Sequence, residues 1–265
     1  MAKRISGTRE WATSFVNCVK GCKNGCKYCY AYTNAVIKFK RLTDKEWHSP
    51  VVNEAAVRKG RKKEEGVVMF PTTHDIFPEV LPACLDVLKK LLVAGNHVLI
   101  VSKPNFECIQ TLCKELDNYK DQILFRFTIG SDNSDILKYW EPNAPCFEER
   151  IAALQCAYKA GFKTSISVEP MLDSQNILTL FSNLEPYVTD TIWIGMMNKV
   201  EQRVKVENEQ DKKMVANILA GQTPERVHEI YNALKDNPHI MWKESFKAVL
   251  GLPEEQEKWA EKDNE

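Results

Sequence analysis

Four cysteines near the start of the chain lie close enough together in sequence to bind a metal ion or an iron–sulfur cluster. The last three, Cys22, Cys26 and Cys29, have the spacing Cys-x3-Cys-x2-Cys, and Cys18 precedes them. Iron–sulfur clusters are held by cysteine thiolates from short, tightly turned loops, usually by four thiolates. Three ligands from this loop would therefore leave one iron open, and chemistry could occur at that iron.

Two other interpretations of these cysteines stay open. Cys18 supplies a fourth thiolate, and four cysteines can bind zinc tetrahedrally. Compact zinc sites, however, normally combine two separated pairs of cysteines, whereas these four cysteines all lie within twelve residues. If Cys18 instead completed an iron–sulfur cluster, every iron would be saturated and the protein would transfer electrons. We expect Cys18 not to be a ligand.

The composition is that of an ordinary globular protein without net charge. Of 265 residues, 44% are hydrophobic, and 36 Lys and Arg balance 36 Asp and Glu. This excludes disordered and fibrous proteins and provides no global field for nucleic acid. Because the chain lacks a signal-peptide pattern and any run of about 18 apolar residues, we expect a cytoplasmic protein without disulfides and without contact with a membrane. The five remaining cysteines are expected to be buried as small apolar residues: Cys84, Cys108, Cys113, Cys146 and Cys156.

Short β-branched or apolar runs alternate with helical patterns along the first 200 residues. Strands are predicted at residues 13–17, 66–70, 97–102, 123–129, 163–168 and 191–195. Helices are predicted at residues 78–94, 106–116, 147–160 and 176–184. This alternation predicts an α/β fold, a partial (β/α)6 TIM-like barrel with parallel strands. An eight-unit barrel or a doubly wound sheet stays open, although no Gly-x-Gly-x-x-Gly turn follows any strand.

The pattern changes after the sixth predicted strand. A polar stretch at 198–213 precedes a helical run at 224–234, an apolar run at 239–243 and an acidic tail from residue 253. We expect a barrel in residues 1–200 and a C-terminal helical extension in residues 201–265, packed together as one structural domain. No heptad repeat is evident, which favours a monomer.

The cysteine loop follows the first predicted strand, and parallel barrels carry their active sites at this end of the strands. With Tyr28 before the third cysteine, this loop resembles that of the radical S-adenosylmethionine (SAM) superfamily. The order of motifs across residues 123–172 is similar to the spore photoproduct lyase-like branch, which includes small phage-encoded members of unassigned activity. Those motifs occupy residues 127–131, 140–145, 148–150, 160–161 and 165–170, and the resemblance covers roughly residues 14–200.

The resemblance implies a [4Fe-4S] cluster on Cys22, Cys26 and Cys29, with SAM bound to the fourth iron through its amino and carboxylate groups. In that superfamily the reduced cluster cleaves SAM to a 5'-deoxyadenosyl radical, which abstracts hydrogen from the substrate. An external electron donor of the flavodoxin or ferredoxin type is also implied. The cofactors carry the difficult chemistry, and the protein supplies binding and orientation.

Polar residues after the second and third predicted strands are candidates to bind SAM. By the resemblance, Thr73, His74 and Asp75 lie where the superfamily places groups against the SAM amino group, and His74 could also transfer a proton. The same run could instead cap the next helix. Tyr28 belongs to the same predicted cofactor site. Lys103 could supply a cation that makes a charge-assisted contact with the SAM carboxylate. Alternatively, it is a solvated lysine at the end of a strand.

Further candidates follow the fourth, fifth and sixth predicted strands. Ser131 offers a hydroxyl to the SAM carboxylate or ribose. Arg150 suits either the same carboxylate or a structural ion pair with Glu141. Glu169 is placed to hold SAM or substrate, and Asn198 is a weaker candidate for adenine or substrate.

The substrate is where the sequence is least informative. Spore photoproduct lyase acts on a thymine dimer in DNA, so the resemblance makes nucleic acid a candidate substrate. The basic run at 58–63 could follow a phosphate backbone or be a solvated helix end. Tyr30 and Tyr32, predicted as catalytic, could relay hydrogen atoms, stack on a base or pack in the core.

These features lead to two hypotheses about function. The first is a radical SAM enzyme of the lyase or transferase type, acting on an unidentified substrate. The second is a non-enzymatic module that binds zinc or an electron-transfer iron–sulfur cluster.

Overall fold

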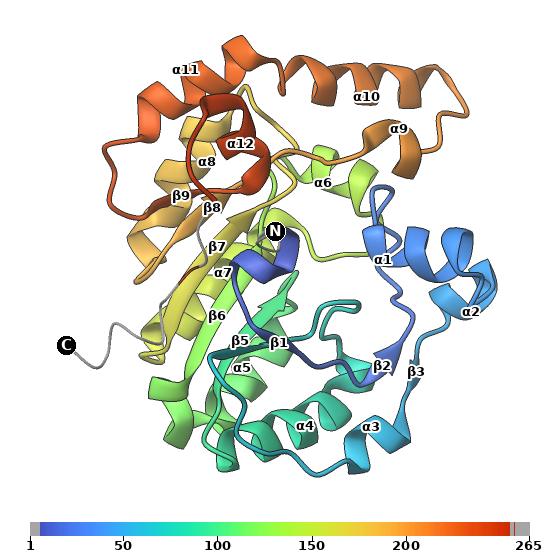
Figure 1. Ribbon diagram of the computed structural model, residues 1–265, viewed down its shortest axis with the longest axis vertical. Coiled ribbons are helices and arrows are strands. Elements are labelled where there is room, and N and C mark those ends of the chain that lie inside the picture. Colours follow the sequence, from blue (N-terminus) through green and yellow to red (C-terminus); the bar gives the residue numbers. More distant parts are fainter. Residues whose placement is uncertain (1–5, 255–256, 258–265) are drawn as a thin grey trace.

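The computed structural model, which describes residues 6–254 and 257, is built around a sheet of seven parallel strands (Figure 1). The strand order is β1-β4-β5-β6-β7-β8-β9, and each neighbouring pair is parallel. The strands are β1 (Ser14–Phe15), β4 (Val67–Phe70), β5 (His97–Ser102), β6 (Ile123–Thr128), β7 (Lys163–Val168), β8 (Ile192–Ile194) and β9 (Ile240–Trp242). The predicted α/β fold with six parallel strands is confirmed; in the part of the chain described, β1 and β9 form the edges of an open sheet.

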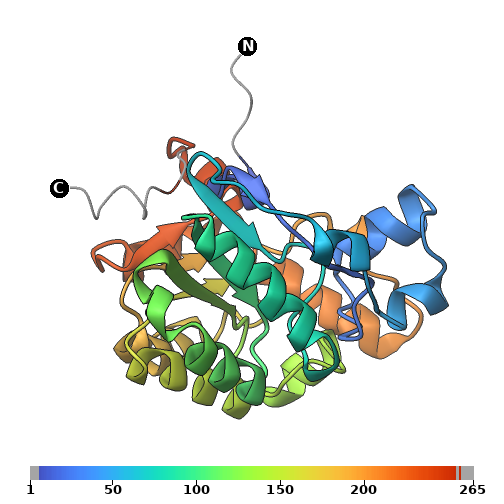
Figure 2. The same cartoon turned by 90° about the horizontal axis from the view of Figure 1, so that it is seen from below.

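Four long helices cover the outer face of the sheet, as predicted (Figure 2). They are α4 (Leu81–Val93), α5 (Phe106–Glu115), α7 (Phe147–Lys159) and α8 (Ile177–Leu184). In α4 the buried residues Cys84, Val87, Leu88 and Leu91 recur at helical spacing, and this stripe packs onto the strands. None of the helices in the described residues is long and apolar enough to cross a membrane.

The segment that follows the cysteine loop and the C-terminal extension lie outside this regular alternation (Figure 1). β2 (Val19–Lys20) lies just before the cysteine loop and pairs antiparallel with β3 (Val51–Val52). The segment after the loop contains, besides β3, α1 (Tyr30–Tyr32), the π-helix η2 (Thr33–Lys38), α2 (Asp44–His48) and α3 (Glu54–Arg58). The C-terminal extension contains α9 (Val200–Arg203), α10 (Glu209–Ala220), α11 (Pro224–Leu234) and α12 (Glu244–Leu250). The remaining elements are η1 (Gly7–Glu10), η3 (Pro78–Val80), η4 (Asp117–Gln122), α6 (Ser134–Trp140) and η5 (Glu185–Tyr187).

The extension also adds β9, a strand that the sequence analysis did not assign. β9 pairs with β8 through Ile240 and Ile192, so residues beyond 200 complete the same sheet. A run of three paired residues is too short to give a periodic signal in the sequence.

The inner face of the sheet encloses a lumen that is apolar at one end. Val67, Leu99 and Leu124, near the N-terminal ends of their strands, pack with Trp11 and Trp193. The two indole rings meet edge to face, with centroids 5.9 Å apart. These side chains close the N-terminal end of the lumen and leave the C-terminal end for a site.

The scattered cysteines only partly follow their prediction. Cys84, Cys108 and Cys113 are buried, as expected. Cys146 is exposed, so its predicted burial is wrong, and Cys156 is half-buried. Cys146 precedes α7 as its N-cap residue and therefore lies at a helix start on the surface.

Glu257, in the predicted acidic tail, lies against the closed end of the lumen. Its Oε1 accepts hydrogen bonds from Arg126 Nη2 at 2.7 Å and from Trp193 Nε1 at 3.1 Å. Its backbone N–H donates to the carbonyl of Glu10. The side chains of Arg126 and Glu257 are 0% and 4% exposed, so the carboxylate neutralises a buried guanidinium.

We expect Glu257→Ala to lower the free energy of unfolding by about 3 kcal/mol, because it leaves the buried Arg126 charge without its partner. Urea denaturation followed by circular dichroism measures this. Glu209→Ala, which removes an exposed ion pair with Lys212, should change stability by less than about 1 kcal/mol. Equal effects of the two substitutions would contradict the assignment of Glu257.

Candidate functional site

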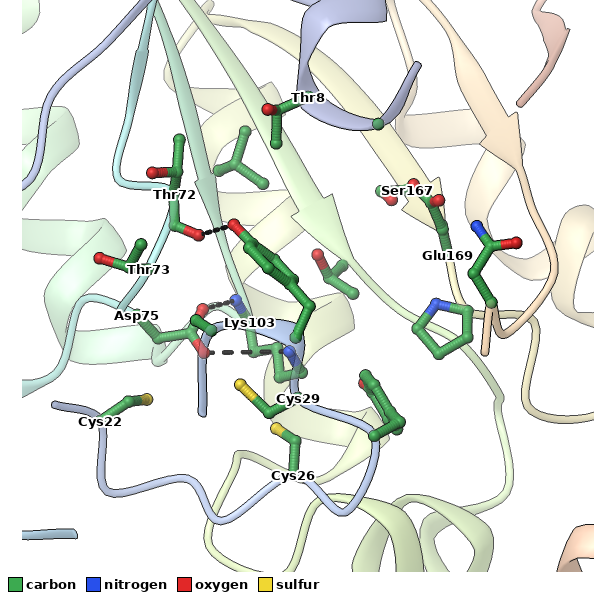
Figure 3. Close-up of a pocket in the computed structure, with 18 of the residues that line it drawn as sticks. Thr8, Cys22, Cys26, Cys29, Thr72, Thr73, Asp75, Lys103, Ser167 and Glu169 are labelled. Atoms are coloured by element: carbon green, nitrogen blue, oxygen red, sulfur yellow. Dashed lines mark hydrogen bonds and ion pairs between the residues drawn. The ribbon is translucent and has the colours of Figure 1, made fainter. Parts of the chain in front are cut away.

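A cavity of about 520 Å³ opens at the C-terminal ends of the strands. Its walls come from the cysteine loop, the ends of β4, β5, β6 and β7, the N-terminal segment, α9 and the start of α12. Figure 3 shows Cys22, Cys26 and Cys29 at one end of this cavity, with Ser167 and Glu169 across from them. The sulfur atoms of the three cysteines face a common space.

The cysteine loop is held in a tight turn between β2 and α1. Gly21 and Gly25 have left-handed backbone conformations, with φ of +85° and +66°, which favour glycine. A Cβ atom at Gly21 would clash with the carbonyl of Trp47. That carbonyl accepts the N–H of Cys22 at 2.9 Å, and the sulfur of Cys29 accepts the N–H of Tyr32 in α1 at 3.4 Å. These contacts direct the thiols of the loop into the cavity.

The three thiols are poor acids in the absence of a cation. Burial raises the pKa of Cys22 to about 12, and burial also raises the pKa of Cys26 and of Cys29. Thiolates are the form that binds metals, so metal binding here must displace protons.

Cys18 is separated from the other three cysteines of the motif. It is fully buried in the core beneath α4, with its Sγ 3.8 Å from Cys84 Sγ, and it does not line the cavity. Its N–H donates to His74 Nε2 at 3.2 Å, and His74 Nδ1 lies 3.1 Å from the carbonyl of Asp75. His74 therefore lines the cavity with both ring nitrogens occupied, and this pattern requires the proton on Nδ1.

Asp75 connects the cysteine loop to the end of β5. Its Oδ2 accepts a hydrogen bond from Asn24 Nδ2 at 2.8 Å, within the loop. Its Oδ1 accepts from the backbone N–H of Lys103 at 2.7 Å and from the hydroxyl of Ser102 at 3.0 Å. Asp75 thus lines the cavity, and its oxygens accept hydrogen bonds from protein groups.

Lys103 presents a buried cation to the cavity. Its Nζ lies 3.9 Å from Asp75 Oδ2 and 3.9 Å from Glu141 Oε1, and its side chain is 12% exposed. Burial alone would lower the pKa of Lys103, but attraction to the neighbouring groups that can ionise, Cys26, Tyr28, Asp75 and Glu141, outweighs burial and holds it well above its usual value. Of these groups, Asp75 and Glu141 form ion pairs with Lys103. Lys103 therefore stays charged at neutral pH.

Glu141 and Arg150 form a buried ion pair next to this lysine. Arg150 Nη2 and the hydroxyl of Tyr28 both donate to Glu141. Arg150 also donates to the carbonyls of Pro145 at 2.8 Å and Thr128 at 3.1 Å, and it does not line the cavity. Of the two roles that the sequence allowed for Arg150, the structure shows the ion pair.

Two other predicted residues also lie outside the cavity lining. Ser131 is fully buried, and its hydroxyl accepts the N–H of Asn133 at 3.0 Å. Tyr32 donates its hydroxyl to Asp44 at 2.8 Å, and its ring packs edge to face on Trp47. Local hydrogen bonds and packing occupy both side chains, and neither the position of Ser131 after a strand nor that of Tyr32 after the cysteine loop revealed this.

Tyr30, Thr73 and Glu169 do line the cavity, as does Tyr28. The hydroxyl of Tyr30 donates to the carbonyl of Thr72, and the ring is 39% exposed. These residues and the three cysteines therefore meet in one space, although they come from widely separated parts of the sequence.

The wall opposite the cysteines holds residues that the sequence analysis missed. Arg203 of α9 and Glu244 of α12 line the cavity, and Lys243 is fully buried behind them. Lys243 Nζ lies 2.6 Å from Glu10 Oε2 and 3.4 Å from Glu169 Oε2. Glu169 and Asn198, also in this wall, had been considered. Arg203 and Glu244 had not, because nothing in the sequence pattern connects the C-terminal extension to the strand ends.

The buried Glu10 carboxyl predicts a pH-dependent stability. Burial, followed by a hydrogen bond with Glu244, raises the pKa of Glu10 from 4.5 to about 8. Between these values the folded protein binds more protons at Glu10 than the unfolded chain, so stability falls as pH rises, by at most about 1.4 kcal/mol per unit. Glu10→Gln keeps a neutral side chain and should reduce this slope in urea denaturation at a series of pH values.

The control for this titration is Glu115→Gln, which changes an exposed carboxylate on α5. It should leave the pH profile of stability close to that of the wild type. Parallel profiles for the wild type and Glu10→Gln would show that Glu10 does not carry the proton.

Comparison with known proteins identifies the family. Residues 16–177 match the family model of the radical SAM superfamily. The chain belongs to this superfamily. A viral relative, the uncharacterised protein ORF301 of Acidianus two-tailed virus, is 26% identical over 260 residues, which cover 92% of this chain and 76% of the relative.

Solved structures with a similar fold include spore photoproduct lyase variants. One, with AdoMet and a dinucleoside spore photoproduct bound, has a TM-score of 0.56 and 15% identity, covering 91% of this chain and 78% of that one. Another has a TM-score of 0.55 and 15% identity over 91% and 79% of the two chains. At this identity the likeness concerns the fold.

Membership of the radical SAM superfamily implies an iron–sulfur cluster and SAM, and the residues present fit both groups. Three thiols from one loop face a common space and leave the rest of the cavity free for a further molecule. Lys103 adds a charged donor suited to a carboxylate. In the described residues no three His, Cys, Asp or Glu side chains are grouped to hold a single metal ion.

Proposed function

We propose that the protein is a radical SAM enzyme with a [4Fe-4S] cluster on Cys22, Cys26 and Cys29. The observation that carries this proposal is the convergence of these three thiols at one end of a cavity of about 520 Å³, with Cys18 buried elsewhere. When bound and reduced, the cluster and SAM supply a 5'-deoxyadenosyl radical that abstracts hydrogen from a substrate.

The residues of the chain divide this task between them. Lys103, held charged by Asp75 and Glu141, orients the SAM carboxylate. Asp75 keeps Lys103 in place relative to the cysteine loop through its bond to Asn24. The loop that carries the thiols forms the wall at their end of the cavity.

The opposite wall is proposed to hold the substrate. Glu169, Asn198, Arg203 and Glu244 line this part of the cavity, and Tyr30 lines the cavity beside Cys29; together they offer hydrogen-bond donors and acceptors and groups of both charges. Tyr30 is the candidate to exchange a hydrogen atom with the substrate. A base or nucleoside of a nucleic acid is the proposed substrate class, supported by the fold likeness to a lyase solved with a dinucleoside photoproduct.

The reaction type, the reductant, the oligomeric state and the location of the protein are also proposals. We propose a lyase or transferase reaction, an external reductant of the flavodoxin or ferredoxin type, a monomeric state and a cytoplasmic location. The division into a barrel at 1–200 and an extension at 201–265 within one domain also stays a prediction, supported by the pairing of β9 with β8.

Anaerobic reconstitution with iron and sulfide tests the proposed function. We expect about four irons per chain, the number in one [4Fe-4S] cluster, and release of 5'-deoxyadenosine from SAM when dithionite is added. Bound zinc, or a cluster that is reduced without any cleavage of SAM, would refute the proposal. The second result would indicate an electron-transfer protein instead.

A further inference from the structure

The segment between the cysteine loop and β4 is strongly basic, although the whole chain is neutral. Residues 33–63 contain nine Lys and Arg and only three Asp and Glu, whereas the chain has 36 of each class. In Figure 1 this segment, with α2, β3 and α3, forms the outer side of the molecule next to the cysteine loop. A local positive field therefore lies on one side of the proposed cluster.

The outer face of this segment combines cations with exposed apolar side chains. Residues 37–41, here called the docking patch, have the sequence Ile-Lys-Phe-Lys-Arg, and all five side chains are exposed. Ile37 is 47% and Phe39 is 50% exposed. Lys38 Nζ and the Arg41 guanidinium lie 5.2 Å and 4.9 Å from the centroid of the Phe39 ring. Exposed apolar side chains ringed by charge are typical of protein interaction sites.

The inner face of the same segment packs directly on the cysteines. Cys22 forms a small buried cluster with Ala31 and Trp47, and Val36 and Leu42 pack against it together with Cys29. Val36 and Leu42 immediately flank the docking patch in the sequence. The segment thus forms a wall that exposes the docking patch on its outer side and packs against Cys22 and Cys29 on its inner side.

We propose that the docking patch binds an acidic redox protein that passes one electron through this wall to the cluster. This inference rests on the proposed function. In the step the donor is oxidised by one electron and the cluster is reduced by one, and no bond is made or broken. Positive charge on this chain and negative charge on the donor would speed their encounter.

The position of the docking patch favours an electron donor over a nucleic acid. A nucleic acid substrate must place a base inside the cavity, and none of the five residues of the patch lines the cavity. An electron, in contrast, needs only a short path through packed side chains, which the contacts from Val36 to Cys22 provide.

The test compares the wild type with a charge-reversed variant, Lys38→Glu, Lys40→Glu and Arg41→Glu combined. Reduced flavodoxin, an acidic flavin protein, is mixed anaerobically with the reconstituted full chain, and bleaching of the cluster absorption is followed by stopped flow. At low salt we expect the variant to react at least about 10-fold more slowly, and the wild-type rate to fall as salt is added. Phe39→Ala, which leaves the charges in place, should also slow the reaction.

The matched control reverses three exposed lysines elsewhere, Lys114→Glu, Lys159→Glu and Lys213→Glu, so that net charge changes equally. This control should keep the wild-type rate within about 2-fold, since local rather than net charge directs docking. An equal loss in the control and in the docking-patch variant would overturn the inference.

Dithionite separates failure of this inference from failure of the proposed function. This small reductant should bleach the cluster and release 5'-deoxyadenosine equally in the wild type and in the docking-patch variant. No cleavage in the wild type would refute the proposed function itself. Normal cleavage with dithionite, together with an unchanged flavodoxin rate in the variant, would refute only the docking site.

Fluorescence anisotropy with a labelled DNA oligonucleotide tests the alternative that the patch binds nucleic acid. If the docking-patch variant loses DNA binding but is reduced by flavodoxin at the wild-type rate, the patch binds nucleic acid and the inference is wrong.

Discussion

Alanine at any one of Cys22, Cys26 and Cys29 is expected to abolish the iron–sulfur cluster and all SAM cleavage. Each thiol lines the same cavity, and none of the other six cysteines lines it to take the place of a lost ligand. With only two thiolates left in the loop, we expect the cluster to be lost completely rather than to be bound more weakly. Iron and sulfide content, the visible absorption and 5'-deoxyadenosine release measure the effect.

Cys18→Ala is the matched control, because it changes a cysteine of the same motif that lies in the core. Its Sγ contacts Cys84 and does not reach the cavity lining. We expect full cluster content and a loss of stability of about 1 kcal/mol from the lost packing. Loss of the cluster in Cys18→Ala, or its retention in any of the other three variants, would contradict the ligand assignment.

The second large effect is expected for Lys103→Met, which removes the cation from the cavity but keeps the length of the side chain. Loss of one charge-assisted contact costs about 2 kcal/mol, so SAM should bind roughly 30-fold more weakly to the reconstituted protein. Isothermal titration calorimetry measures the affinity. The cluster should stay intact, because Lys103 is not a ligand.

Lys89→Met provides the control for this prediction. Lys89 forms an exposed ion pair with Glu115 on the outer helices, far from the cavity lining. Its loss should leave SAM affinity unchanged. Asp75 and Glu141 keep their other hydrogen bonds in Lys103→Met, so the fold is retained. If Lys103→Met binds SAM as tightly as the wild type does, the charge of Lys103 serves only its ion pairs with Asp75 and Glu141.

Much of the architecture could be predicted because it depends on short-range patterns. Buried parallel strands appear as apolar runs, and the helices between them repeat their apolar residues on one face, as α4 does. The short strand β9 and the lumen closure by Glu257 were missed, since each depends on pairing between distant segments. The prediction that Cys146 is buried was wrong for the same reason, because burial depends on neighbours from elsewhere in the chain.

The sequence by itself determined the chemistry at one end of the cavity. Ligand spacing within a loop is a local property, so Cys22, Cys26 and Cys29 could be recognised together with their family. Only the tertiary structure showed that Cys18 lies in the core, that Arg150 neutralises Glu141, and that Arg203 and Glu244 reach the cavity. A side chain's direction follows from packing and from the need to pair buried charge, and both are set by residues far away in the sequence.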